Sequence, residues 1–88
     1  MAKAYIPQYK TTIIAEEGTG DNLLREDYEQ GYVDYINITV LDSDGEELDG
    51  GMLLLKDYFD DLYPKGSEDR LLKDAVSEVY GDVDYQLV

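Results

Sequence analysis

The run Tyr32–Leu41 constrains the fold of this 88-residue chain more than any other segment. Ile36, Ile38 and Val40 recur at every second position, which is the pattern of a β-strand with one buried face. Asp44-Gly45 follows, and this dipeptide is typical of tight hairpin turns. The sequence therefore predicts an antiparallel β-hairpin near the middle of the chain.

The remaining segments predict a single domain, residues 1–88, of the α+β class. We expect a three- to four-stranded antiparallel sheet with two helices packed on one face. Ser67 suits a helix N-cap, and Gly81 suits the residue just beyond a helix C-terminus. The expected elements are strands over Tyr9–Glu16, Tyr32–Leu41, Glu46–Met52 and Asp82–Val88, a short helix over Leu23–Glu29 capped by Asp21 or Asn22, and helices over Leu54–Leu62 and Ser67–Tyr80.

The charge of the chain is strongly one-sided. It carries 21 acidic and 7 basic side chains, a net charge of −14. Acidic disordered segments are poor in aromatic residues, whereas this chain has nine tyrosines and is 43% hydrophobic, so a fold is expected. Double-stranded DNA carries one charge per roughly 1.7 Å, so fourteen charges match about 24 Å of duplex. A protein surface that binds DNA is therefore a plausible partner, and nucleic acid itself is not.

The composition argues against several other classes. Without Cys or His, the chain has no disulfide and no thiolate nucleophile. It also has no imidazole that could act as a base or as a metal ligand. No phosphate-binding glycine loop or serine elbow is present, so we expect neither an enzyme nor a cofactor. No segment resembles a membrane span or secretory signal, which predicts a cytoplasmic protein that does not bind membranes.

The segment Asp42–Glu47 resembles the start of a calcium-binding EF-hand loop, but the match fails. That motif needs glycine after its third ligand position and glutamate at its twelfth position. Here Gly45 follows the second Asp directly, and the twelfth position is Leu53. We therefore expect no specific metal site.

Two groups of carboxylates are the candidate partner-binding residues. Alternate residues on a strand project to one side about 6.6–6.8 Å apart, close to the phosphate spacing of one DNA strand. Glu47 and Asp49 are expected to have this spacing. Tyr28 and Tyr32 lie beside the second group and are expected to anchor a partner, because tyrosine is a common interface residue. The first acidic group is Asp42, Asp44, Glu46, Glu47 and Asp49, and the second acidic group is Glu26, Asp27, Glu29 and Asp34.

Two other interpretations of these carboxylates stay open. Charge runs commonly form a solvated face, and turns and helix N-termini favour Asp and Glu for local reasons. The chain could also be a generic acidic interaction module or subunit that binds a basic protein without imitating DNA. Competition with DNA for one site on the partner separates this module from a DNA mimic.

A small, cysteine-free, strongly acidic single domain with a strand-rich first half, an Asp-Gly hairpin and paired helices resembles phage-encoded anti-CRISPR and anti-restriction DNA-mimic proteins. The resemblance covers the architecture of residues 32–80 and transfers no functional residue. It implies an inhibitor of a bacterial defence nuclease, with a Cas effector as the partner in the host cytoplasm. Carboxylates would then occupy the Arg and Lys surface that holds target DNA.

Overall fold

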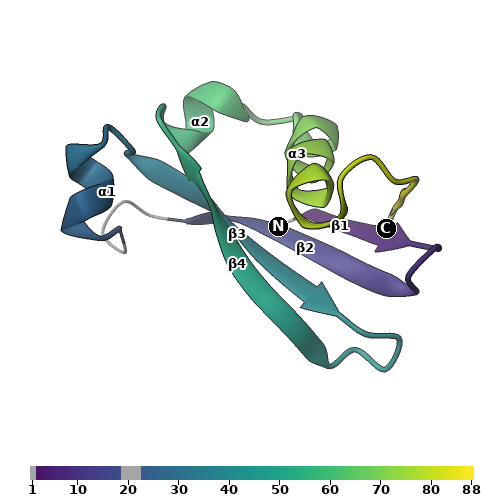
Figure 1. The fold of residues 1–88 in the computed structure, drawn as a ribbon. Helices are drawn as coiled ribbons and strands as arrows, with labels where there is room; N and C mark the ends of the chain where they lie inside the picture. The colour runs from purple at the N-terminus through teal and green to yellow at the C-terminus, as the bar shows by residue number, and fades with distance from the viewer. Residues whose placement is uncertain (1, 19–22) are drawn as a thin grey trace.

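The structure, a computed structural model, describes residues 2–18 and 23–88, which form a five-stranded antiparallel sheet and three helices (Figure 1). The strand order is β4-β3-β2-β1-β5. The α+β class is as predicted, with one or two strands more than expected. The strands are β1 (Ala2–Ile6), β2 (Thr11–Gly18), β3 (Asp34–Leu41), β4 (Glu47–Leu55) and β5 (Gln86–Leu87), and the helices are α1 (Arg25–Glu29), α2 (Phe59–Leu62) and α3 (Glu68–Tyr80).

The predicted central hairpin is confirmed, but its return strand is longer than expected. β4 continues past Met52 to Leu55, so Gly50-Gly51 lies inside the strand and does not end it. The helix expected over Leu54–Leu62 is wrong in its first half, because only its last four residues form α2. Leucine spacing in a short apolar run fits either a helix or a strand. Leu54 pairs with Tyr35 and Leu55 pairs with Asp34 on β3, so these two residues belong to the strand.

The N-terminal prediction missed β1 and began β2 too early. A tight turn joins these strands, in which Lys10 has a left-handed backbone (φ 53°) and the Tyr9 N–H donates to the Ile6 carbonyl at 3.2 Å. Tyr9 therefore belongs to the turn, and its ring stacks on Tyr80 at a centroid distance of 4.5 Å. β1 is short, and two of its three buried residues are alanines, which makes its alternating pattern weak.

Other helices and strands also begin or end at residues different from those predicted. α1 begins at Arg25, two residues later than expected, and the proposed caps Asp21 and Asn22 lie outside the described residues. The last strand is shortened from Asp82–Val88 to the two residues of β5. α3 has nearly its expected length, and Gly81 follows it with φ 76°.

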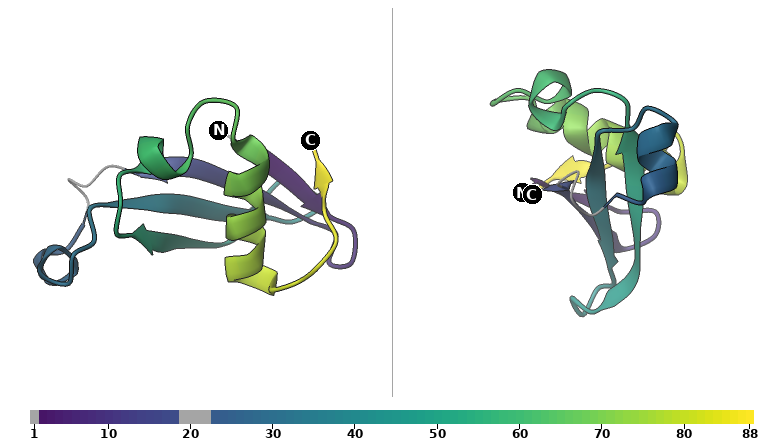
Figure 2. Two further views of the ribbon diagram at one scale, coloured as in Figure 1. Left: turned by 90° about the horizontal axis from the view of Figure 1, so that it is seen from above. Right: turned by 90° about the vertical axis from the view of Figure 1, so that its left-hand side faces the viewer.

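One buried cluster joins the sheet to two helices. Alternate residues of β1, β2 and β3 share this cluster with residues of α2 and α3, which lie over the same side of the sheet (Figures 1 and 2). Leu71, Leu72, Ala75 and Val76 form the buried stripe of α3 at helical spacing. Small alanines on β1 and β2 leave room for α3 to approach the sheet closely.

The molecule is elongated, measuring 38 × 26 × 20 Å. α1 lies at one end of the sheet and the β3–β4 turn extends from the other (Figures 1 and 2). None of the helices in the described part of the chain is long and apolar enough to cross a membrane.

Candidate partner-binding surface

The tip of the β3–β4 hairpin is organised by a carboxylate of the first acidic group. Asp42 Oδ1 accepts the backbone N–H groups of Asp44 and Glu46, each at 2.9 Å. Gly45 adopts φ 83°, a conformation that favours glycine. Asp42 therefore holds the turn, and it is half-buried, so it presents less charge to a partner than its neighbours do.

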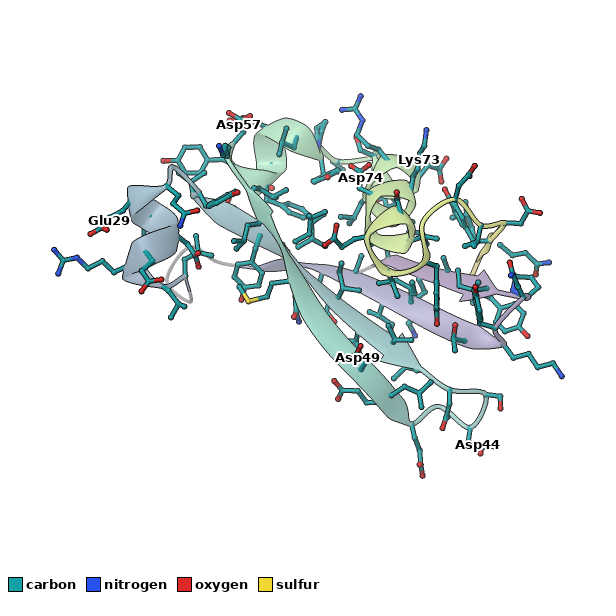
Figure 3. All side chains as sticks on the ribbon, in the orientation of Figure 1. Glu29, Asp44, Asp49, Asp57, Lys73 and Asp74 are labelled. Atoms are coloured by element: carbon teal, nitrogen blue, oxygen red, sulfur yellow. The ribbon has the colours of Figure 1, made fainter. Side chains whose placement is uncertain are left out.

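The other four members of the first acidic group are exposed. Figure 3 shows Asp44 at the tip of the hairpin and Asp49 farther along β4. Asp49 Oδ1 accepts the Gly50 N–H at 2.8 Å. The structure thus brings Asp44, Glu46, Glu47 and Asp49 together on the protruding end of one hairpin.

A β-bulge changes how two of these carboxylates project. Glu47 pairs with Leu41, whereas Asp49 pairs with Val40, because Leu48 is an extra residue in β4. Leu41 and Val40 are consecutive residues of β3 and face opposite sides of the sheet. The expectation that Glu47 and Asp49 share one side, at DNA-like spacing, is therefore wrong.

The second acidic group is less uniform than its sequence implied. Glu26 and Glu29 are exposed on α1, and Glu29 forms an ion pair with Arg25 at 3.2 Å. Both partners of that pair are largely solvent-exposed, so the pair contributes little to stability. Asp27 is half-buried.

Asp34, the fourth member of the second acidic group, has a structural contact. It is half-buried, and its Oδ2 accepts the N–H of Phe59 at 2.8 Å. Phe59 is the first residue of α2, whose N-cap residue Tyr58 makes no side-chain cap bond. A carboxylate from β3 therefore satisfies the N-terminus of α2, a role that no local sequence signal could reveal.

The two acidic groups do not form one patch. They lie at opposite ends of the eight-residue strand β3, about 24 Å apart at the usual rise per residue. Figure 3 shows Glu29 on α1 at one end of the molecule and Asp44 at the other. A partner that contacts both groups must follow the long dimension of the protein.

The two proposed tyrosine anchors differ in exposure. Tyr28 is 50% exposed on α1 beside the second acidic group. Tyr32 is half-buried, and the Lys56 ammonium lies 5.4 Å from the centre of its ring, within cation–π range. Sequence reasoning missed Tyr58, which is 63% exposed and lies just before α2. Its position in a predicted helix face concealed it, since that helix begins only after it.

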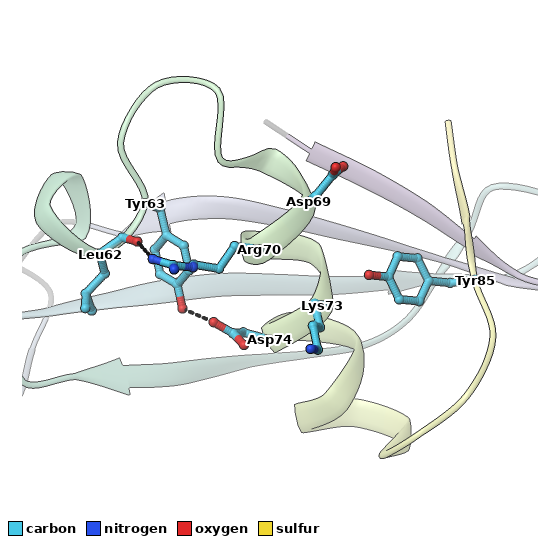
Figure 4. A pocket seen from close by; sticks show the side chains of 7 residues that line it. All are labelled: Leu62, Tyr63, Asp69, Arg70, Lys73, Asp74 and Tyr85. Atoms are coloured by element: carbon cyan, nitrogen blue, oxygen red, sulfur yellow. Dashed lines mark hydrogen bonds between the residues drawn. The ribbon is translucent and has the colours of Figure 1, made fainter.

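A hollow of about 600 Å³ lies between α2, α3 and the C-terminal segment (Figure 4). The Tyr63 hydroxyl donates to Asp74 Oδ2 at 2.6 Å, and Arg70 Nη1 donates to the Leu62 carbonyl at 3.2 Å. Burial, and then the bond to the Asp74 carboxylate, raise the pKa of Tyr63 above its usual range. These contacts join α2 to α3, so we assign them to the fold.

Metal binding finds no support in the described residues. Within 2–18 and 23–88, no three Asp or Glu side chains converge closely enough to hold a metal ion. The Asp42 carboxylate that opens the acidic turn is directed to backbone N–H groups instead.

Comparison with known proteins adds no relative from which a role could be inferred. The chain matches no protein-family model, no curated protein sequence and no solved structure.

Proposed function

We propose that this protein is a stoichiometric inhibitor that occupies the basic, nucleic-acid-binding surface of a bacterial defence nuclease, with a Cas effector as the first candidate. The observation that supports this most is the uncompensated charge from Leu23 to Gly50. That stretch holds nine carboxylates and one arginine, and it supplies α1 and the protruding hairpin. Among the described residues only Arg25–Glu29 forms an ion pair.

Unpaired like charges destabilise a small domain by mutual repulsion, so their retention calls for a use. Binding to a basic groove would be such a use, because the Arg and Lys side chains of the groove neutralise the carboxylates when the complex forms. Complementary charge also speeds association and makes it sensitive to salt. Exposed Tyr28 adds an amphipathic anchor beside the second acidic group.

A second candidate is an acidic module that binds a basic protein without imitating DNA. Fourteen net charges over 38 Å give one charge per roughly 2.7 Å, a lower density than the 1.7 Å of duplex DNA. The bulge in β4 also breaks the phosphate-like spacing of Glu47 and Asp49. Both observations favour charge complementarity over a close geometric copy of DNA.

Competition separates the two candidates. A guide-loaded Cas effector is titrated with labelled target DNA at increasing concentrations of this protein, and DNA binding is followed by fluorescence anisotropy. We expect mutual exclusion that weakens as salt is raised. If the effector binds the protein and the DNA together without loss of either affinity, the inhibitor proposal is wrong for that effector.

Charge reversal then tests which surface makes the contact. The double variant Asp44→Lys/Glu46→Lys changes exposed carboxylates of the hairpin, and Asp82→Lys/Asp84→Lys is its control of equal charge near the C-terminus. We expect the hairpin variant to raise the Kd by about tenfold more than the control, about 1.4 kcal/mol. Equal losses would show that net charge alone matters. Asp74 is unsuitable as a control because it binds Tyr63.

A further inference from the structure

β4 is a long strand at the edge of the sheet, and β3 is its one neighbouring strand among the described residues (Figure 1). Its first six residues, Glu47–Met52, are all exposed. An edge strand presents unpaired backbone N–H and C=O groups to any further strand. β4 is thus a place where another chain could add to this sheet.

The hydrogen bonds identify which backbone groups face outward. The Gly50 N–H is bound by the carboxylate of Asp49, so it points away from β3. Backbone groups alternate in direction along an antiparallel strand, which directs the N–H of Met52 outward as well. The outward N–H of Gly50 is hydrogen-bonded to the Asp49 carboxylate of the same strand. An added strand would have to compete with that carboxylate for this N–H.

Gly51 is not required by the backbone of β4. Its φ lies outside the left-handed region, and a Cβ placed there would meet nothing within 4 Å. Glycine inside a strand commonly marks a place where another backbone or ligand approaches closely. Gly51 pairs with Ile38, on the helix-covered side of the sheet, so the open space beside it faces the end of α3.

A hollow of about 250 Å³ occupies that position. Ile38 and Val40 are buried and lie on β3, and Val79 lies on α3. Asp49 and Glu78 also line the hollow. An apolar surface with carboxylates beside it fits a Lys or Arg side chain, whose methylene stem packs against apolar atoms while its charged group meets the carboxylates.

We propose that the β4 edge binds an extended, Lys- or Arg-containing segment of the partner as an additional strand, with one basic side chain in the hollow beside Gly51. This deepens the proposed function, and it rests on that function only for the basic character of the partner. The same carboxylates disfavour a second copy, because edge-to-edge pairing of two β4 strands would place the exposed carboxylates of both copies in one sheet. Attraction of one partner and repulsion of another is how charged edges achieve specificity.

The test uses a synthetic ten-residue peptide that alternates valine with lysine, together with two versions methylated on alternate backbone nitrogens. All three peptides carry the same charge, but each methylated version has one edge blocked. We expect one methylated peptide to bind like the parent and the other to bind at least tenfold more weakly. Backbone amide shifts in the ¹⁵N spectrum should change at Gly50, Gly51 and Met52. Equal binding of all three peptides, or shifts confined to α1, would overturn the proposal.

Two variants of the whole chain complete the test. Gly51→Val fills the hollow and should weaken parent-peptide binding about tenfold, while its melting temperature shows whether it still folds. Asp49→Asn should also weaken binding, whereas Asp44→Asn, an equal change of charge at the hairpin tip, should have less effect. Peptide binding unaffected by both Gly51→Val and Asp49→Asn would overturn the proposal. So would a dimer of the protein that Gly51→Val dissociates in sedimentation experiments.

Failure here is distinguishable from failure of the proposed function. If the protein competes with DNA on an effector but the peptides do not bind the β4 edge, only the strand-addition proposal fails. If the peptides bind β4 and no DNA-binding effector is displaced, the inhibitor proposal fails and the edge site stands.

Discussion

At the scale of single residues, several polar groups that a sequence presents as surface charge have specific partners. Asp34 caps α2 from a neighbouring strand, and Asp42 holds the hairpin turn. A glycine can be equally specific. A Cβ at Gly18 would overlap the ring of Tyr35, its cross-strand neighbour on β3, and Tyr35 is only 8% exposed. Close approach of this ring to the β2 backbone therefore depends on glycine.

This contact predicts different outcomes for two glycines in neighbouring regions of the sheet. Gly18→Ala should lower the free energy of unfolding by about 1–3 kcal/mol, because the tyrosine ring must move. Gly51→Ala, the matched control, meets open space and should change stability by less than about 0.5 kcal/mol. Urea unfolding followed by circular dichroism measures both, and equal losses would contradict the assigned role of Gly18.

At the scale of elements, α2 is too short to be stable by itself and depends on contacts with its neighbours. Asp34 binds its N-terminus, and Tyr63, just after its C-terminus, binds Asp74 on α3. Phe59 and Tyr63 pack their rings 5.2 Å apart above the sheet. The four residues of α2 are thus held in place by side chains at both ends.

The Tyr63–Asp74 bond predicts a stability loss with a defined pH dependence. Tyr63→Phe should reduce the free energy of unfolding by about 1–2 kcal/mol, since a half-buried carboxylate loses its donor. The folded-state pKa of Tyr63 is raised, so the bond stabilises fully below the unfolded value near 10 and is lost as pH rises beyond it. The difference between wild type and variant should therefore be constant from pH 6 to about 9 and shrink in stronger alkali.

Urea titrations across that range measure the difference. Tyr58→Phe serves as the control, because Tyr58 is mostly exposed and its replacement should change the free energy of unfolding little. A Tyr63→Phe effect no larger than that of Tyr58→Phe would contradict the role assigned to the bond.

At the scale of the whole molecule, repulsion among carboxylates dominates the electrostatics. The net charge is −14. Among the described residues there is one salt bridge, and it is exposed. The elongated shape separates the two acidic groups to opposite ends, which reduces but does not remove their repulsion. Stability should therefore depend on ionic strength more than it does for a domain of balanced charge.

Added salt should raise the melting temperature of the free protein. From about 0.01 M to 1 M salt the Debye length falls from roughly 30 Å to 3 Å, which screens the repulsion. Calorimetry in sodium chloride and in potassium chloride should give the same rise, since screening does not depend on the cation. A melting temperature that is constant across this range would contradict self-repulsion as a major cost. Binding to a basic partner should weaken over the same range.

Local patterns in the sequence were enough to predict the features that depend on neighbouring residues. The period of two in Ile36, Ile38 and Val40 with Asp44-Gly45 predicted the hairpin, and the apolar spacing of Leu71 to Val76 predicted α3. The order of the charged residues also placed most of the net negative charge before residue 50. These signals are local, because side-chain direction in a strand or helix follows directly from position along the chain.

Which residues contact one another across the fold could not be predicted from these local patterns. Strand pairing extended β4 through Leu55, and the extra residue Leu48 turned Glu47 and Asp49 to opposite faces. The fold also recruited Asp34 to cap α2 and left β4 as an exposed edge. Each outcome depends on a partner distant in sequence, and the free energy of such a contact is set by the packed arrangement and not by the local pattern. The net charge could therefore be predicted from the sequence, whereas the arrangement of the charged side chains on the surface could not.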